Sequence, residues 1–491
     1  MNNERYGMTF HTVSGNDYYY DSGTGKVALC EKTEADMIAS VLEGKKSLED
    51  ICRENPEFEA FIQQEHLFQC PTHTRFSIPS KEEFIKSVKE SCGQIILELT
   101  EACNLRCGYC IYQEHHPQHR AFGNRNMTFE TAKKSMDYIL KSHSSPKFAL
   151  TFYGGEPLIN FKVMKESIEY MRSQYPRQPF DISFTTNMTL MTKEIAQYLH
   201  ELPCEVNILC SMDGPEEMHN LYRKYPDGAG SFQSAMYGLE ILRNYFYDPA
   251  KDKKIAINCV MAPPYSKRNM ERLDTFFRNT LALPEKIECS FEYMDTAKMP
   301  LHLENGKAIA DDIEGKLEKS PLEEWAADSI LENPKYQKRF DLISRDMGRV
   351  ANRLRSQDGL IQEIPLLGNC IPGQRRIYVT VDGKFKTCEK VGEIPYLGDC
   401  ERGIDYDKVY QLYYEDYDRN LREICKDCWA QPLCSICYER TMGTNGIRLK
   451  KDDAVCASSR RIIKDMFVNY FRYYEEDADG LMNNLKKYTF S

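Results

Sequence analysis

The sequence predicts an α/β protein whose central part is a parallel sheet, wound flat or closed toward a barrel. Between about residues 93 and 300, short apolar segments alternate with amphipathic segments of helical period. Repeated strand–helix units of this kind favour a parallel sheet, because each crossover helix returns the chain to the same edge. The length of 491 residues and a hydrophobic content of 42% further indicate several domains, each able to bury a core.

Six segments of this region are expected to be buried strands. They are QIILELT, FALTFYGGEP, DISFTTN, CEVNILCSMDG, KIAINCVMAP and KIECSFEY. Expected helices between them include residues 129–142, 162–173 and 232–244. Chemistry in such folds lies at the carboxyl ends of the strands. The cysteines that follow the first strand and the GGEP that follows the second should therefore lie at the same mouth.

Residues 1–92 are expected to form a separate N-terminal unit. The segment DYYYDSGTGKVALC is typical of a β-hairpin, with residues 23–25 near its turn. Two or three short helices follow, with Gly44 as a stop and Ser47 as an N-cap. A hairpin with helices indicates a winged-helix-like module, a class that usually binds DNA. However, this unit carries 10 Lys and Arg against 16 Asp and Glu, a balance that opposes phosphate and favours peptide binding.

The C-terminal part reads as a charged bridge, a cysteine-rich module and a tail. Residues 301–368 are expected to be a solvated helical bridge, residues 369–475 a turn-rich module, and residues 476–491 a polar tail behind an amphipathic helix. Eight of the 19 cysteines lie between Cys370 and Cys456. In a cytoplasmic protein, clustered cysteines more often bind metal or do redox chemistry than form disulfides.

Charge and hydropathy argue against two classes of partner. The net charge is −10 and no basic stripe is present, so nucleic acid is a poor candidate for the main partner. No apolar run reaches the roughly 18 residues that a membrane span needs. The first ten residues also lack the apolar core of a signal peptide. We therefore expect a cytoplasmic protein without nucleic-acid or membrane partners.

Three closely spaced cysteines follow the first predicted strand. In TEACNLRCGYC, three residues separate Cys103 from Cys107 and two separate Cys107 from Cys110. A 4Fe–4S cube takes four ligands, so three cysteines can hold three irons and leave the fourth iron open. Gly108 lets the loop wrap tightly. The spacing alone also allows a structural zinc site completed by a distant residue; the nearby histidines are His115, His116 and His119.

This spacing, with an aromatic residue before the last cysteine, resembles the radical S-adenosylmethionine (SAM) enzymes. Three further segments resemble SAM-binding segments of that family in the same order: YGGEP at 153–157, TTNM at 185–188 and SMDGPEEMHNLYR at 211–223. The resemblance implies a partial (β/α)6 barrel over residues 93–300. Its open iron would chelate SAM, and SAM cleavage would give a 5′-deoxyadenosyl radical that abstracts a hydrogen atom.

The resemblance also implies which residues contact SAM. Tyr109 would lie near the adenine, and Glu156 with the Gly154–Gly155 backbone would meet the amino group. The ribose-contacting strand end contains Thr186 and Asn187. The last segment places Ser211 and Arg223 at the carboxylate, with Asp213 in the same stretch.

The C-terminal cysteines follow the pattern Cys370, Cys388, Cys425-x2-Cys428-x5-Cys434-x2-Cys437 and Cys456. Two zinc ribbons would also use C-x2-C pairs, but the whole pattern resembles the SPASM domain of peptide-modifying radical SAM enzymes. That domain carries two auxiliary 4Fe–4S clusters, which makes three clusters in all. The pattern departs from the commoner form, which has three residues where this sequence has two between Cys434 and Cys437.

By position, the resemblance assigns the ligands of both auxiliary clusters. Cys425, Cys428, Cys434 and Cys456 would hold the second cluster. Cys370, Cys388 and Cys437 would hold the first, which leaves it with three clear ligands. Either its fourth iron is open and binds a substrate thiolate, or Cys400 or another residue closes it.

The order of these parts resembles maturases of ribosomally made peptides, whose N-terminal unit grips a leader peptide. CIYQEHH at 110–116 and RRIYVTVDGKFKTCEKVGE at 375–393 are most similar to maturases that form cysteine thioethers, the sactipeptide and ranthipeptide enzymes. The resemblance implies S–C cross-linking of a cysteine-containing precursor peptide, with a flavodoxin or ferredoxin as reductant. Glu389, next to Cys388, is a candidate catalytic base, although its CEK segment also fits a solvated loop.

Three other functions remain open at this point. A SPASM enzyme could make carbon–carbon cross-links in a peptide. It could instead oxidise Cys or Ser to formylglycine in a sulfatase, although that reaction needs no separate leader-binding unit. A winged-helix iron–sulfur sensor could bind DNA, but the acidic N-terminal unit and the SAM-contact segments argue against it.

Overall fold

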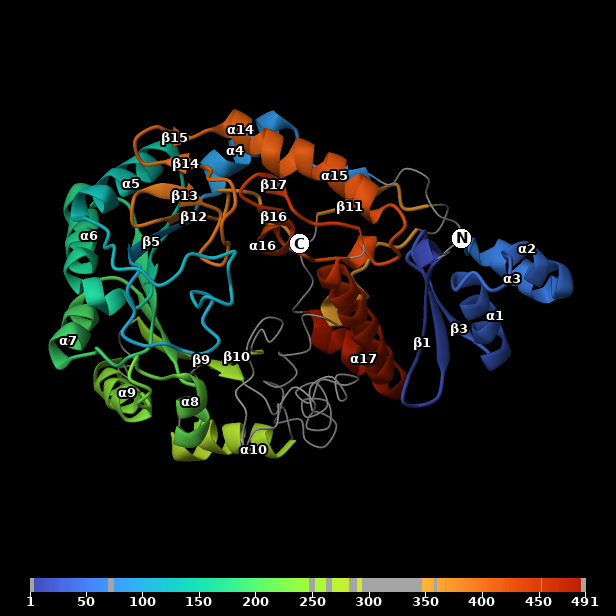
Figure 1. Ribbon diagram of the computed structural model, residues 1–491, viewed down its shortest axis with the longest axis horizontal. Coiled ribbons are helices and arrows are strands. Elements are labelled where there is room, and N and C mark those ends of the chain that lie inside the picture. The colour runs from blue at the N-terminus through green and yellow to red at the C-terminus, as the bar shows by residue number, and fades with distance from the viewer. Residues whose placement is uncertain are drawn as a thin grey trace. The chain divides into compact units, whose positions relative to one another are not determined.

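The computed structural model describes residues 4–68, 75–246, 252–261, 267–281, 289–293, 347–356, 360–366, 368–451 and 453–486. By packing, the described chain divides into two compact units (Figure 1). The first unit draws on Met1–Ser80, Ala326–Asn369 and Gln411–Ser491, and the second on Lys81–Trp325 and Cys370–Tyr410. Most of the predicted helical bridge, residues 301–368, lies outside the described residues.

A single sheet organises the second unit. Six of its strands are parallel and lie side by side in chain order: β5 (Gln94–Thr100), β6 (Phe148–Gly154), β7 (Phe180–Thr186), β8 (Val206–Ser211), β9 (Lys253–Met261) and β10 (Cys289–Tyr293). All six predicted strands are thereby confirmed. The consecutive order is what repeated strand–helix units produce when the chain always advances in the same direction.

The sheet continues into the C-terminal cysteine-rich region, which the sequence did not indicate. Strand β12 (Arg376–Val379) pairs in parallel with β5, and three antiparallel strands extend the edge. These are β13 (Lys384–Lys386), β14 (Gly398–Asp399) and β15 (Gly403–Ile404). Residues 370–410 therefore pack with the six parallel strands, while residues 411–486 belong to the first unit.

Helices cover one face of this sheet (Figure 1). They are α5 (Phe129–Ser142), α6 (Phe161–Gln174), α7 (Lys193–Glu201), α8 (Glu216–Tyr222), α9 (Phe232–Phe246) and α10 (Lys267–Thr275). Along β6, Phe148, Leu150 and Phe152 are buried, whereas the alternate residues are half-buried. Since successive strand residues point to opposite faces, the alternate residues line the uncovered hollow face of the sheet.

The first unit starts with an antiparallel sheet of β1 (Gly7–His11), β2 (Asp17–Asp21) and β3 (Val27–Cys30), followed by α1 (Lys32–Leu42), α2 (Leu48–Glu54) and α3 (Pro56–Glu65). The predicted hairpin is β2–β3, and β1 adds a strand that was not predicted. Ser47 caps α2 by accepting a hydrogen bond from the Asp50 amide. Helix α4 (Lys81–Ser91), predicted as part of the N-terminal unit, packs instead in the second unit.

The rest of the first unit comes from the C-terminal region and ends in α17 (Ala454–Leu485), which crosses the predicted boundary at residue 475. Helix α17 packs on the N-terminal sheet through one buried core, which includes Phe10, Tyr18, Tyr20, Trp429, Phe467 and Phe471. The Tyr18 hydroxyl donates to the Glu475 carboxylate at 2.8 Å. Residues from both ends of the chain thus share one core.

The remaining elements are short. They are β4 (Arg75–Ser77), β11 (Glu363–Pro365), α14 (Tyr406–Tyr410), α15 (Asp416–Cys425), α16 (Tyr438–Thr441), β16 (Met442–Gly443), β17 (Gly446–Ile447), and the 3-10 or π turns η1 (Glu4–Tyr6), η2 (Pro157–Asn160), η3 (Phe276–Thr280), η5 (Gln411–Glu415) and η6 (Gln431–Leu433). Among the described helices, none combines the length and the apolar character needed to cross a membrane.

Candidate active site

The loop Cys103–Cys110, called here the three-cysteine loop, is fixed at both of its ends by backbone hydrogen bonds. At its start, the Gly155 amide donates to the Thr100 carbonyl at 2.9 Å, where β5 and β6 end together. Farther along, the Gly108 amide donates to the Tyr222 carbonyl at 2.9 Å at the end of α8. The cysteines and the GGEP segment therefore lie at the same mouth, as predicted.

The two glycines of GGEP are required by this close approach. A Cβ at Gly154 would lie 2.3 Å from the Thr100 carbonyl oxygen, and the φ of Gly154 is +143°, in the region that favours glycine. A Cβ at Gly155 would lie 2.2 Å from the Ala102 oxygen. Any side chain here would push the three-cysteine loop away from the end of β6.

Glu156 ties the end of β6 to the end of β7. Its carboxylate accepts hydrogen bonds from the Thr186 hydroxyl at 2.9 Å and the Asn187 amide at 2.8 Å. The side chain is buried, and this burial raises the pKa of Glu156 to about 7. The Asn187 side-chain amide in turn lies 4.0 Å from the Cys103 sulfur. Three predicted SAM-contact residues are thereby brought beside the three-cysteine loop.

Asp213 organises the other side of the site. Its carboxylate accepts from the Tyr109 hydroxyl at 2.5 Å, from Nε of Arg223 at 2.7 Å and from the Val260 amide at 2.9 Å. The Asp213–Arg223 pair is buried, and Nη1 of Arg223 lies 3.9 Å from the Cys107 sulfur. Ser211, at the end of β8, is also buried. The predicted SAM-contact residues therefore surround the loop from two directions.

Burial controls the protonation of the three thiols. It raises the pKa of Cys103 and of Cys107 to about 12, and it also raises the pKa of Cys110. Bound iron reverses this preference, because a cation strongly favours the thiolate form of its ligands. Within the described part of the chain, no three Cys, His, Asp or Glu side chains are placed to hold one single metal ion. The ligands of a 4Fe–4S cluster bind separate irons, so they surround a larger space than the ligands of one ion.

Comparison with known proteins identifies this part of the chain. Residues 97–277 match the model of the Radical SAM superfamily. These residues form a radical SAM domain. The family implies SAM and one 4Fe–4S cluster as cofactors, and the loop with its three thiols and one glycine-lined edge fits that cluster.

Several relatives share this domain. The chain is 34% identical over 151 residues to an uncharacterized protein of Methanocaldococcus jannaschii, a match that covers 31% of this chain and 49% of that protein. It is 31% identical over 144 residues to the serine-type anaerobic sulfatase-maturating enzyme of Bacteroides thetaiotaomicron, covering 29% and 34% of the two chains. The chain thus spans less than half the length of these curated relatives.

The fold also has solved counterparts. The structure of anSMEcpe with bound AdoMet and Cp18Cys peptide is similar with a TM-score of 0.53 and 19% identity, over 80% of this chain and 99% of that one. At this identity the likeness concerns the fold, and it supports the α/β radical SAM architecture predicted from the sequence.

The hollow face of the sheet contains a cavity of about 530 Å³. Its lining combines apolar side chains with polar side chains from consecutive strands, including Gln94, Thr151, Ser183, Asn207 and Lys254. Glu389 lines the same cavity, where its carboxylate forms an ion pair with Arg376 at 3.2 Å. The structure thus places the candidate base in the cavity, held by an arginine, and its catalytic role stays a prediction.

A buried ion pair beside the site was not predicted. Glu98, in the middle of β5, is 2% exposed and accepts a hydrogen bond from Nε of Arg120 at 2.6 Å. The Arg120 guanidinium stacks over the Tyr112 ring, 3.7 Å from its centre. The sequence did contain a sign of this pair, because QIILELT carries one carboxylate, Glu98, among the apolar residues of the strand.

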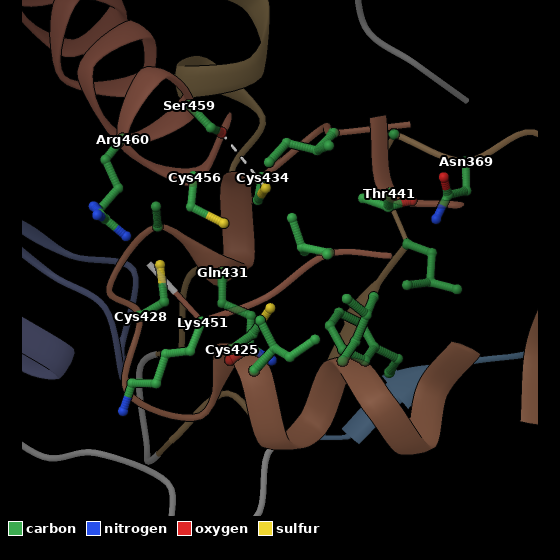
Figure 2. A pocket seen from close by; sticks show the side chains of 18 of the residues that line it. Asn369, Cys425, Cys428, Gln431, Cys434, Thr441, Lys451, Cys456, Ser459 and Arg460 are labelled. Atoms are coloured by element: carbon green, nitrogen blue, oxygen red, sulfur yellow. Dashed lines mark hydrogen bonds between the residues drawn. The ribbon is translucent and has the colours of Figure 1, made fainter. Parts of the chain in front are cut away.

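Four other cysteines gather around a cavity of about 310 Å³ in the first unit, called here the four-cysteine cavity (Figure 2). Cys425 ends α15, Cys428 follows in the next turn, Cys434 follows η6, and Cys456 lies in the first turn of α17. Burial raises the pKa of the Cys425, Cys428 and Cys456 thiols, and it raises that of Cys456 to about 11. These are the four cysteines that the sequence pattern grouped, and the donor set fits an iron–sulfur cluster.

The cysteines assigned to the other auxiliary cluster are distributed over both units. Cys370 is exposed and Cys388 follows β13 in the second unit, while Cys437 precedes α16 in the first. The Cys400 amide donates to the Gly383 carbonyl at 2.9 Å, at the start of β13. Five residues of nearly extended chain, on the order of 15 Å, separate that point from Cys388. This placement argues against Cys400 as the fourth ligand beside Cys388.

Proposed function

We propose that this protein is a radical SAM enzyme that modifies a ribosomally made peptide by forming cysteine thioether cross-links. The observation that carries the proposal is the four-cysteine cavity, which lies outside the radical SAM domain and in the same unit as the acidic N-terminal sheet and helices. A radical generator, a second cluster site and a separate peptide-binding module in one chain favour peptide maturation.

With cluster and SAM bound, the domain supplies a 5′-deoxyadenosyl radical that removes a hydrogen atom from carbon. The residues of the chain orient SAM for this reaction. Glu156 offers a carboxylate to the SAM amino group, and its pKa of about 7 leaves it ionised at mildly alkaline pH. Asp213 fixes both Arg223 and Tyr109, so that the guanidinium and the ring keep one orientation beside the three-cysteine loop.

A peptide substrate suits the hollow face of the sheet. Its lining mixes apolar side chains with a few amide, hydroxyl and charged groups, which is the usual composition of a site for an organic ligand. Two similarities support this part of the proposal. The anSMEcpe enzyme, which has the same fold, was solved with a bound Cp18Cys peptide, and the curated relatives include sulfatase-maturating enzymes.

The cross-link to sulfur is the finer part of the proposal. The placement of Cys400 away from Cys388 leaves the first auxiliary cluster with three assigned cysteines. A cluster with one open iron would bind a substrate thiolate, because thiolates are the natural ligands of such iron. Binding would remove the thiol proton and hold the sulfur for bond formation.

Formylglycine formation is a second candidate, because curated relatives of the radical SAM domain are named sulfatase-maturating enzymes. The N-terminal sheet with its three helices weighs against it, since a sulfatase maturase needs no separate grip on a leader. Carbon–carbon cross-linking of a peptide stays open as well.

One co-expression experiment distinguishes the three reactions. The chain is produced anaerobically with a short cysteine-containing precursor encoded next to its gene, and the peptide is examined by mass spectrometry. A thioether removes two hydrogen atoms and blocks alkylation of the cysteine. A carbon–carbon link removes two hydrogen atoms but leaves the thiol reactive, and formylglycine reacts with an aldehyde probe.

A matched control is the enzyme with Cys103, Cys107 and Cys110 changed to alanine, which should neither cleave SAM nor modify the peptide. Cleavage by this variant would disprove the active-site assignment. Reconstitution should give about twelve irons per chain, four for each of three clusters. A value of about four would show that the auxiliary clusters are absent.

A further inference from the structure

Two side chains from α17 reach sulfurs of the four-cysteine cavity. Ser459 and Arg460 follow Cys456 by three and four residues, so the three side chains project from the same side of the helix. The Ser459 hydroxyl lies 3.5 Å from the Cys434 sulfur, and Arg460 lines the same cavity. Figure 2 shows both side chains on the wall of the cavity beside Cys456. One helical turn thus supplies one of the four sulfurs, contacts a second and adds a cation to the cavity wall.

Arg460 and Lys451 both contribute a positive charge to the wall of the four-cysteine cavity. Lys451 also lines the cavity, but its Nζ is ion-paired with the Asp427 carboxylate at 3.0 Å. Arg460 acts electrostatically on both Cys428 and Cys456. The two cations therefore form a natural comparison, with equal charge but different partners.

The start of α17 adds positive potential at the same place. Asp453 caps the helix by accepting a hydrogen bond from the Val455 amide at 3.2 Å, and Cys456 follows within the first turn. Helix α17 runs unbroken from Ala454 to a kink at Asp477, and the partial positive charge at its N-terminus favours negative charge on a nearby thiolate. The Ser459 hydroxyl, the Arg460 guanidinium and the N-terminus of α17 therefore all lie at the four-cysteine cavity.

We propose that Ser459 and Arg460 are positioning residues for a 4Fe–4S cluster in the four-cysteine cavity, where the Ser459 hydroxyl beside the Cys434 sulfur and the positive charge of Arg460 raise the reduction potential of the cluster. Reduction adds a negative charge to the cluster, so donors and cations around the sulfurs stabilise the reduced form more than the oxidised form. The inference rests on the cluster assigned to this cavity under the proposed function. It adds that the residues around the cavity favour a cluster that accepts electrons readily.

The test uses the full chain with the cysteines of the three-cysteine loop changed to alanine, which removes the SAM-binding cluster. This protein is then reconstituted with iron and sulfide. A redox titration follows the reduced clusters by electron paramagnetic resonance. The signal of the four-cysteine cavity is identified by its loss in Cys434→Ala. Iron content is measured for every variant, so that loss of a cluster is distinguished from a change in its potential.

Arg460→Gln and Ser459→Ala should each lower the midpoint potential of the identified signal, and Arg460→Lys should lower it less than Arg460→Gln. Lys451→Gln, the matched control, should leave the potential unchanged. Unchanged potentials in Arg460→Gln and Ser459→Ala, with iron retained, would overturn the inference but leave the cluster assignment intact. If Arg460→Gln loses iron, the midpoint potentials of Ser459→Ala and Arg460→Lys are compared with that of the unsubstituted background instead. If Cys434→Ala removes no signal and no iron, the assigned cluster itself is absent.

Discussion

Replacing Phe467 by alanine should destabilise the first unit strongly, because this ring fills the core between the N-terminal sheet and α17. Phe467 is fully buried, and its ring centre lies 4.8 Å from that of Tyr20 and 5.5 Å from that of Phe10. Truncation of a buried phenylalanine to alanine costs about 3–5 kcal/mol, which includes the lost burial and the cavity left behind. That cost lowers the folding equilibrium constant by a factor of about 10² to several times 10³.

The sequence provides a probe for this unit alone. The chain contains two tryptophans, Trp325 and Trp429, so the Trp325→Phe background leaves Trp429 as the single fluorophore. The Trp429 ring lies 6.3 Å from the Tyr20 ring and belongs to the same buried core. Urea unfolding followed by Trp429 fluorescence should show Phe467→Ala shifting the midpoint down by about 1–3 M, given typical dependences on urea.

A surface substitution in the same unit is the control. Leu29 on β3 is 63% exposed, so Leu29→Ala should change the free energy of unfolding by less than about 0.5 kcal/mol. Phe467→Leu keeps most of the volume and should fall between the two variants. A Trp429 midpoint for Phe467→Ala that equals that of Leu29→Ala would refute a shared core between the two ends of the chain.

Three further predictions concern the site. SAM affinity, measured by calorimetry on the reconstituted enzyme, should rise roughly tenfold from pH 6 to pH 8 as Glu156 ionises through its pKa of about 7; an affinity independent of pH would contradict this. Asp213→Ala should cost about 3–5 kcal/mol in denaturant unfolding, because it leaves the buried charge of Arg223 unpaired, and a loss below 1 kcal/mol would count against it. Cys400→Ala should keep the full iron content, whereas Cys388→Ala should lose about four irons per chain.

Most of the second unit follows from local sequence. Its strands are apolar segments of β-branched and aromatic residues, and its helices begin at clear caps, as where Thr128 accepts a hydrogen bond from the Thr131 amide at α5. Parallel order follows from the alternation of strands and helices. Local patterns therefore identified all six parallel strands, whereas the close backbone approach that requires the glycines of GGEP was not predicted.

The parts that were not predicted depend on partners distant in the sequence. Strand β12 joins the sheet beside β5, although about 280 residues separate them along the chain. The Glu98–Arg120 pair forms because a loop folds back over the strand, which no periodicity reveals. The ion pair between Asp213 and Arg223 was likewise not predicted. The motif contains both residues, but a sequence motif does not show which side chains bind each other.

The cysteines show the same division. Cys425, Cys428, Cys434 and Cys456 were grouped from the family resemblance, and all four line one cavity although Cys456 lies on α17, well along the chain from the others. Cys400 was ambiguous, because only strand pairing fixes it beside Gly383 and away from Cys388.

The hydrogen bond from Tyr18 to Glu475 joins residues that are 457 positions apart. During synthesis at about 5–20 residues per second, the N-terminal sheet must therefore wait roughly 25–90 s for the helix that covers its aromatic face. Until then Phe10, Tyr18 and Tyr20 lack the residues of α17 that complete their core. Cys456 emerges from the ribosome equally late, so the four thiols of the four-cysteine cavity come together only near the end of synthesis.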